Sequence, residues 1–232
     1  MISFIVPAYN EEKFIGATLE SIFASARAVG EEFEVIVVND ASTDKTAQLA
    51  RDCGARVIDV HKRQIAAVRN SGAKEARGEV LFFVDADTLV PEGSIRAALA
   101  AIKAGAIGGG ARVKISDPLQ LRYRIFMVVF SFFYFSIARL AAGCFVFMRK
   151  DVFDKTCGFD ERYYASEEVH LSRALKRLGR FVIVREAVLT SGRKAKQYSL
   201  GQQLKLFFTL LLKGPRYLMK REGLDFWYKR LD

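Results

Sequence analysis

Two aspartates one residue apart, Asp85 and Asp87, are the residues whose type and spacing most directly suggest chemistry. They follow the apolar run Val80–Val84, which is typical of a buried strand. If the strand continued, alternation would bring both carboxylates to one face. Mg²⁺ is usually held by one or two carboxylates with phosphate and water, and Mn²⁺ suits the same ligands. The pair therefore predicts a divalent-metal site, with a polar turn as the alternative.

Three more side chains have types that suit a nucleotide ligand. Asp40 follows the run Val35–Val38 and could accept a hydrogen bond from the imide N–H of uracil or from another base, or instead cap the next helix. Arg69 could reach a diphosphate, unless it is an exposed helical arginine. Arg193 follows the last expected strand and could close over the diphosphate, the alternative being a solvated basic loop.

The elements that must position these residues alternate along the first half of the chain. We expect strands at residues 2–6, 33–38, 55–60 and 80–84, and helices at 11–28, 43–53 and 64–76. This order predicts βαβ units around a parallel sheet, in which ligands bind at the carboxyl ends of the strands. Polar clusters at 7–11, 39–42 and 85–87 fall at those ends, so we expect one shared site.

The second half is less regular. Strands are expected at 143–148 and 181–184, a helix at 167–178, and an amphipathic helical pattern from residue 200, broken at Gly214–Pro215. The apolar segment 125–138 is too short to cross a membrane, which takes about 20 residues. This segment could instead form a buried helix, a dimer contact or a helix at a membrane interface. Basic and aromatic residues near the carboxyl end favour contact with a membrane surface.

Composition narrows the class of protein. The chain has 232 residues, 51% of them apolar and 27% charged, which suits a folded domain and excludes a disordered one. The chain has three cysteines without a CxxC pair and two histidines, which argues against a zinc site and against a disulfide framework. The start shows no signal-peptide pattern, so a cytoplasmic location is expected. The net charge of +10 suits an acidic partner or serves solubility.

Taken in order, four motifs resemble the family 2 glycosyltransferases. They are Phe4–Glu12, Val38–Asp44, Arg69–Gly72 and Asp85–Asp87. The resemblance continues through residues 158–161 and 166–168, to about Lys194. It implies the α/β GT-A fold, a Rossmann-like and mostly parallel sheet flanked by helices. We expect one catalytic domain over residues 1–198, with a donor half at 1–115 and an acceptor half at 116–198, and a helical extension at 199–232.

The resemblance also implies roles for single residues. Asp40 would bind the base, Arg69 would approach the diphosphate, and Asp87 would be the main metal ligand. Asp85 would lie near the ribose and the metal. The remaining residues implied to bind the nucleotide-sugar are Pro7, Tyr9, Glu11 and Asp160.

The family's catalytic base is usually the second acid of a Glu-Asp pair at the start of a later helix. Here the pair is Glu167–Glu168, so Glu168 takes that position, and the longer side chain leaves Glu167 as the alternative base. Without the resemblance, two acids in a first helical turn would simply complement the helix dipole. His170 and Cys157 are further departures from the family pattern.

The implied reaction is an inverting single displacement. A UDP- or GDP-linked sugar would pass to an acceptor hydroxyl, with Mg²⁺ or Mn²⁺ at the leaving diphosphate. A peripheral-membrane enzyme acting on polyprenyl phosphate is the nearest alternative. The chain lacks the phosphate loop that a nucleotidyltransferase would need, which argues against that class. It also lacks a recognised basic module for nucleic acid, so we expect no nucleic-acid partner. A processive synthase is disfavoured because the chain has no Gln-x-x-Arg-Trp motif.

Overall fold

The computed structural model describes residues 1–117, 121–193, 201–202, 205, 209 and 215–224. One sheet forms its centre, with the strand order β3-β2-β1-β4-β7-β6-β8-β5. The strands are β1 (Ile2–Ala8), β2 (Phe33–Asp40), β3 (Arg56–Val60), β4 (Val80–Val84), β5 (Thr88–Leu89), β6 (Gly108–Ile115), β7 (Phe145–Arg149) and β8 (Phe181–Thr190).

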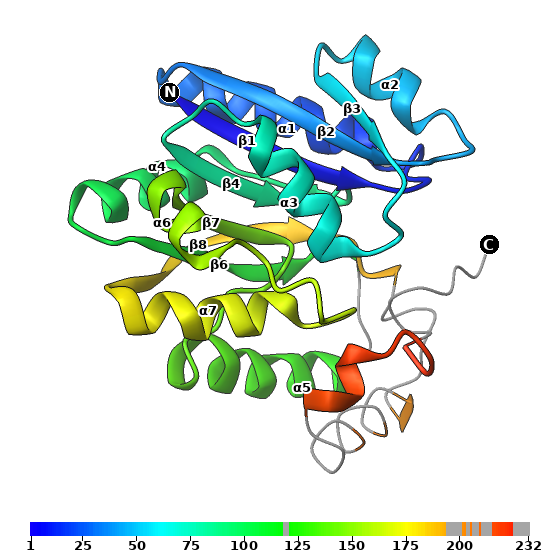
Figure 1. Ribbon diagram of the computed structural model, residues 1–232. Helices are drawn as coiled ribbons and strands as arrows, with labels where there is room; N and C mark the ends of the chain where they lie inside the picture. Colours follow the sequence, from blue (N-terminus) through cyan, green and yellow to red (C-terminus); the bar gives the residue numbers. More distant parts are fainter. Residues whose placement is uncertain (118–120, 194–200, 203–204, 206–208, 210–214, 225–232) are drawn as a thin grey trace.

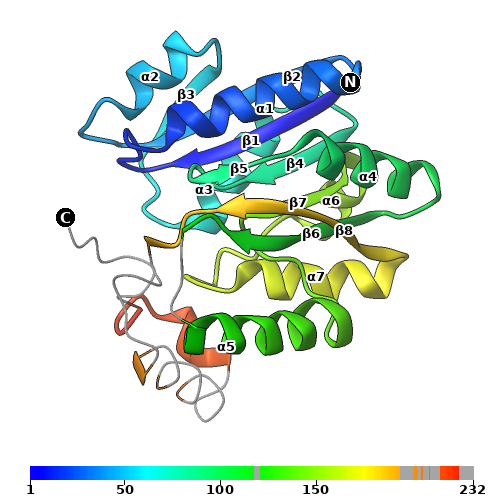
Figure 2. The same ribbon diagram turned by 180° about the vertical axis from the view of Figure 1, so that it is seen from behind.

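Helices cover both faces of the sheet (Figure 1). On one face lie α1 (Ile15–Val29) and α4 (Glu92–Lys103), with α2 (Thr46–Asp52) beside α1. The other face carries α3 (Ile65–Glu75), α6 (Lys150–Thr156) and α7 (Glu167–Leu178). Beyond α7, away from the sheet, lies α5 (Leu121–Ser131), which continues into the π-helix η1 (Phe132–Ile137); a short 3₁₀ helix, η2 (Pro215–Met219), is also described. The view from behind shows the same layering (Figure 2).

The apolar runs of the central strands supply both cores. In β1, Phe4 and Val6 face the α1 side, whereas Ile5 faces the α3 side, and all three are fully buried. Phe82 and Phe83 of β4 divide between the faces in the same way. A sheet covered on both faces needs continuous apolar strands, because every side chain meets a helix layer.

Strand direction explains where the polar residues gather. β1, β2, β3 and β4 are parallel, so their carboxyl ends share one edge. β7 runs antiparallel to both β4 and β6, and β8 is parallel to β6, so β8 ends at that same edge. The segment entering β7 begins there too. One edge therefore receives loops from distant parts of the chain.

The structure confirms the α/β fold class and the alternating elements of the first half. The helix expected at 167–178 has the predicted bounds, and the strand expected at 181–184 extends to Thr190. Sequence patterns missed β6, which opens with three glycines. A Cβ on Gly109 would lie 1.9 Å from the Val182 carbonyl oxygen, so the glycine permits close strand packing. The division into halves stays a prediction, and the helical extension at 199–232 lies largely outside the described residues.

Candidate active site

The loops at the carboxyl ends of β1, β2 and β3 share an unusual backbone conformation. Asn10, Ala41 and Arg63 have positive φ angles of 52°, 55° and 53°. Non-glycine residues adopt this region at an energetic cost, and such residues cluster at functional sites. The Asn10 side chain accepts the backbone N–H of Thr43 at 2.6 Å, which joins the first two loops. The edge of the sheet is therefore a set of tight, cross-braced turns.

Arg193 joins two carboxylates at this edge. Its guanidinium donates to both carboxylate oxygens of Glu11, at 2.7 and 2.9 Å, and lies 3.1 Å from Asp87 Oδ2. It arrives there because β8 pairs with β5 directly after Asp87, and Ser191 N–H donates to the Asp87 carbonyl at 3.2 Å. Burial would lower the pKa of Arg193, but its hydrogen bonds to Glu11 and the charge of Asp87 raise it.

Arg69 is the central cation of a second cluster and is only 2% exposed. It donates to Asp85 Oδ1 at 2.7 Å, to the Gly143 carbonyl at 2.8 Å, and to Glu167. Burial opposes its charge, but the charges of Asp85 and Glu167 raise the pKa of Arg69 above its usual value. Arg69 therefore stays charged and holds Asp85, one of the two expected metal ligands, and Glu167 in one network.

The second acid, Glu168, lies beside this network. Burial, followed by repulsion from Glu167, raises the pKa of Glu168 to about 8. A Cβ on Gly143 would lie 3.6 Å from the Glu168 carboxyl carbon and 3.2 Å from Arg69 Nη2, so the glycine leaves space beside both groups. A carboxyl group with such a pKa exchanges its proton close to neutral pH, and its carboxylate form is a stronger base than that of an ordinary glutamate.

Asn70 positions the loop that leads to the acid pair. Its side chain accepts the Phe159 N–H and donates to the Phe159 carbonyl, both at 2.9 Å, and also reaches Glu161 Oε1 at 2.9 Å. A Cβ on Gly158 would lie 2.5 Å from Asn70 Oδ1, which explains the glycine. Asn70 was part of the sequence motif but received no role from it. Only the contact with Phe159, 89 residues away, reveals this role.

The expected base-binding residue, Asp40, is buried and already positions backbone. Its two carboxylate oxygens accept the N–H groups of Lys62 and Arg63, at 2.6 and 2.8 Å. The Arg63 guanidinium lies over the Tyr9 ring, 4.0 Å from its centre. These contacts bring Asp40 and Tyr9 to one side of the edge. Recognition of a base by Asp40 stays a prediction.

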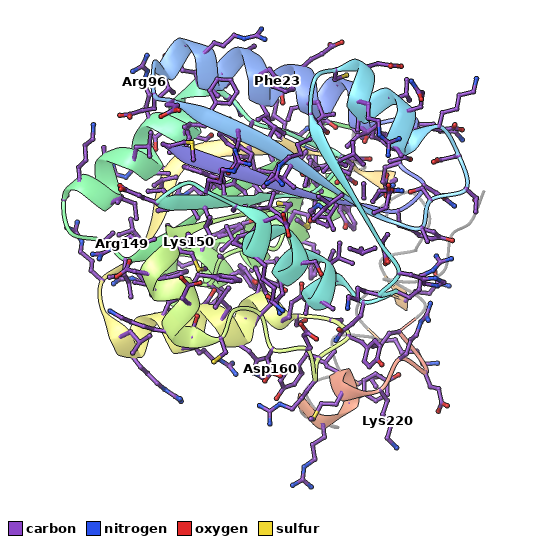
Figure 3. The ribbon with its side chains drawn as sticks, turned by 45° about the horizontal axis from the view of Figure 1, so that its top comes forward. Phe23, Arg96, Arg149, Lys150, Asp160 and Lys220 are labelled. Atoms are coloured by element: carbon purple, nitrogen blue, oxygen red, sulfur yellow. The ribbon has the colours of Figure 1, made fainter. Side chains whose placement is uncertain are left out.

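The remaining expected residues, Pro7 and Asp160, have other partners or surroundings. Pro7 is buried within β1. Asp160 binds the guanidinium of Arg162 at 2.7 Å, which lowers its pKa. Figure 3 shows Asp160 on the side of the molecule where Lys220 also lies, whereas Phe23 and Arg96 lie at the opposite edge.

Asp85 and Asp87 suit a divalent metal that is completed by ligand oxygens. Their side chains are 34% and 11% exposed and offer hard carboxylate oxygens. Within the described part of the chain, no group of three or more His, Cys, Asp or Glu side chains could hold a metal. Two carboxylates with phosphate and water are the usual arrangement for Mg²⁺. Burial and the two aspartates raise the pKa of the neighbouring Cys144 thiol well above its usual value, which argues against a cysteine nucleophile.

Two solved structures of glycosyltransferases are similar to this fold. Residues 1–349 of TarS from S. aureus match with a TM-score of 0.65 at 23% identity, over 83% of this chain and 61% of that chain. The mannosyltransferase PcManGT from Pyrobaculum calidifontis, in complex with GDP-Man and Mn²⁺, matches with a TM-score of 0.71 at 19% identity, over 92% of this chain and 64% of that one. The fold is the GT-A fold.

Relatives by sequence match a part of this chain. The glycosyltransferase EpsJ of Bacillus subtilis (strain 168) is 37% identical over 95 residues, which cover 39% of this chain and 27% of the relative. An undecaprenyl-phosphate 4-deoxy-4-formamido-L-arabinose transferase of Pectobacterium carotovorum is 31% identical over 100 residues, 39% of this chain and 30% of the relative. The matched segment thus spans less than a third of each of these relatives.

The sequence profile described as glycosyl transferase family 2 matches residues 3–157, which contain Asp40, Arg69 and both aspartates of the metal candidate. This match covers more than half of the chain. With the GT-A fold and the arginine-linked carboxylates at one sheet edge, it shows that the chain belongs to glycosyl transferase family 2.

Proposed function

We propose that this chain transfers a sugar from a nucleotide-sugar to an acceptor hydroxyl by an inverting single displacement. The observation that carries the proposal is the network around Arg69. We call the sheet edge at the carboxyl ends of β1, β2, β3 and β4 the donor edge. Arg69 joins Asp85 at this edge to Glu167, the residue before Glu168. The groups that would bind the leaving diphosphate and the group that would take the proton therefore lie side by side.

On the donor side, Asp85 and Asp87 would hold Mg²⁺ or Mn²⁺. Such a metal neutralises charge on the departing diphosphate. Arg193 would add a second positive charge for the diphosphate, in exchange for its contacts with Glu11 and Asp87. Solved structures of TarS contain UDP and UDP-GlcNAc, and PcManGT contains GDP-Man, which supports a UDP- or GDP-linked donor and a hexosyl group.

On the acceptor side, Glu168 is the better candidate for the general base. Glu167 is 3% exposed and engaged by Arg69, whereas the raised pKa of Glu168 makes its carboxylate form a stronger base. Glu168 would take the proton of the acceptor hydroxyl as its oxygen attacks the anomeric carbon. The new glycosidic bond forms while the bond to the diphosphate breaks.

A polyprenyl phosphate acceptor is the second candidate. It is favoured by the relative named as an undecaprenyl-phosphate transferase. The attacking atom would then be a phosphate oxygen, and the enzyme would work peripherally at the cytoplasmic face of a membrane. Among the described residues, no helix is long and apolar enough to cross a membrane.

Thermal unfolding with a panel of nucleotide-sugars, each with and without Mg²⁺ or Mn²⁺, tests the donor half. We expect one donor class to raise Tm, and the increase to depend on metal. The Asp87→Ala variant should lose the metal-dependent part, whereas an exposed carboxylate variant, Asp52→Ala, should keep it. Equal binding with and without Asp87 would refute its ligand role.

Release of nucleoside diphosphate then separates this function from other classes. A glycosyltransferase releases a nucleoside diphosphate from the donor as the sugar moves. A nucleotidyltransferase would instead release pyrophosphate from a nucleoside triphosphate, and a nucleic-acid binder would release neither. Pyrophosphate release, or binding of nucleic acid alone, would overturn the proposal.

A further inference from the structure

The outward side of α5 and η1 carries an unusual surface. Large apolar side chains that are 52–70% exposed project from it. We call this the outer apolar face, made of Ile125, Val128, Val129, Phe132, Phe133 and Ile137. α5 is the outermost helix on this side of the molecule in both opposite views (Figures 1 and 2). An apolar patch of this kind on a folded protein marks an interaction site.

The same helix has a separate inner side, so the outer face is not needed for its own packing. Phe126, Phe130 and Tyr134 stack in sequence, with ring centres 6.0 and 5.4 Å apart. Phe135 is buried, and the Tyr134 hydroxyl donates to the Ala141 carbonyl at 2.9 Å. These contacts use a different set of side chains from the outer apolar face, whose side chains stay largely exposed in the described part of the chain.

Positive charge borders the outer apolar face. Arg124 and Arg139 are exposed on its own segment, and Arg173 and Lys176 lie on the adjoining helix α7. Lys176 donates to the Ala138 carbonyl at the end of η1. Burial, and then the charges of Arg139 and Arg173, lower the pKa of Lys176, so the three cations lie close together. The sequence contains no Asp or Glu between Asp117 and Asp151.

We propose that the outer apolar face inserts into the headgroup region of a membrane that contains anionic lipids. Aromatic and aliphatic side chains would enter the interface while the bordering cations bind lipid phosphates. A symmetric dimer through this face fits less well, because it would bring like charges together around the contact. The cations that border the face complement anionic lipid headgroups, so we assign the face to a lipid partner.

The face also lies close to the site along the chain. η1 ends at Ile137, and Gly143, whose carbonyl accepts from Arg69, follows six residues later. Between them, Ala141 N–H donates to Ser172 Oγ of α7 at 3.1 Å. Combined with the proposed function, on which this step alone rests, membrane contact would place Glu168 where a lipid-linked acceptor can reach it.

Vesicle co-sedimentation at low salt tests the membrane surface. The probes are phosphatidylcholine vesicles with and without phosphatidylglycerol. We expect the whole chain to bind the anionic vesicles, and the Phe132→Ser/Phe133→Ser variant to bind them about tenfold or more weakly, because two apolar side chains are lost from the interface. Leu178→Ser, at an apolar residue 57% exposed on α7, is the matched control and should bind like the wild type.

Charge is tested separately. Arg124→Gln and Arg139→Gln should each weaken binding to anionic vesicles by about fivefold, as expected for one cation near a charged surface. Lys103→Gln, at an exposed cation on α4, is the control and should have no effect. Added salt should weaken wild-type binding in the same direction.

Wild-type protein that ignores anionic vesicles would overturn the proposal, as would full binding by the double phenylalanine variant. A lipid-free dimer that this variant disrupts, measured by sedimentation without vesicles, would assign the face to a second copy and also overturn it. The increase in Tm on adding donor, measured for every variant, tests the proposed function separately from vesicle binding. Loss of vesicle binding with an unchanged donor shift supports the membrane surface, whereas absence of any donor shift in the wild type refutes the function alone.

Discussion

The proposed donor edge and the proposed membrane surface, the outer apolar face, would use opposite means of recognition. At the donor edge, Arg69 and Arg193 hold Asp85, Asp87, Glu11 and Glu167 in hydrogen bonds and ion pairs. On the outer apolar face, large side chains are left exposed and only its border is charged. Directional groups must be paired and positioned before they can act, whereas apolar association is non-directional. This difference explains why short motifs identify the residues at the sheet edge, whereas composition alone hints at the outer apolar face.

The largest effect should come from removing the proton acceptor. We expect Glu168→Gln to lower the transfer rate by about 10²–10⁴-fold, the usual contribution of a general base. Donor binding should survive, because the donor-edge carboxylates are unchanged. Rates are compared with the donor-induced thermal shift of the same variant. Glu167→Gln serves as the comparison, and full transfer by Glu168→Gln would remove Glu168 from its role.

Next in size is the loss of the central cation. Arg69→Met should reduce the free energy of unfolding by about 3–5 kcal/mol, since it leaves buried carboxylates without their partner. Denaturant unfolding measures the change. The control, Arg51→Met, alters an ion pair whose side chains are 49% and 61% exposed and should cost far less. Equal costs for both variants would show that the Arg69 network is not a stabilising centre.

Arg193 should matter for the donor more than for the fold. Arg193→Ala should weaken donor binding by about 10–100-fold, as expected when charged hydrogen bonds worth about 1.5–3 kcal/mol are lost. Titration calorimetry with the donor and metal measures this. Metal binding without donor should not weaken, because the substitution removes a cation beside Asp87. Unchanged donor affinity would mean that Arg193 only pairs with carboxylates of the donor-free protein and does not bind the donor.

The pH dependence should reflect Glu168. Its pKa of about 8 in the folded chain lies above the usual value of about 4.3, so the folded state keeps a proton that the unfolded state has lost between these values. Stability must then fall as the pH rises through that interval. We expect the Tm of the wild type to decline more than that of Glu168→Gln from about pH 5 to about pH 8, while kcat/KM rises toward a plateau. Parallel Tm curves would contradict the raised pKa.

The smallest effect on stability should come from the outer apolar face. Phe132→Ser should change the free energy of unfolding by no more than about 0.5 kcal/mol, because its side chain is 58% exposed. By comparison, Phe83→Ser, at a fully buried ring, should be strongly destabilising. A large loss at Phe132 would mean that the face packs against protein, and the contrast between the two regions would disappear.

Much of the donor half could be predicted because its signals are local. Val80–Val84 is a continuous apolar run that ends in Asp85, and the structure gives this strand the same bounds. Strand β6 could not be predicted, because glycines carry no hydrophobic pattern and matter here only through close packing against β8. Asn70 was equally hidden, since its role depends on Phe159, 89 residues away.

By itself, the sequence determined the alternating elements, the polar clusters at strand ends, the resemblance to family 2 and the acids that compete for the role of base. Only the tertiary structure decided how these parts meet. Arg69 pairs with Glu167 across 98 residues, and Arg193 with Glu11 across 182. Such pairs depend on strand order and direction, which bring one edge of the sheet together from both halves of the chain. Exposure of the outer apolar face was likewise decided by what packs around α5, because an apolar run has the same letters whether it is buried or faces a membrane.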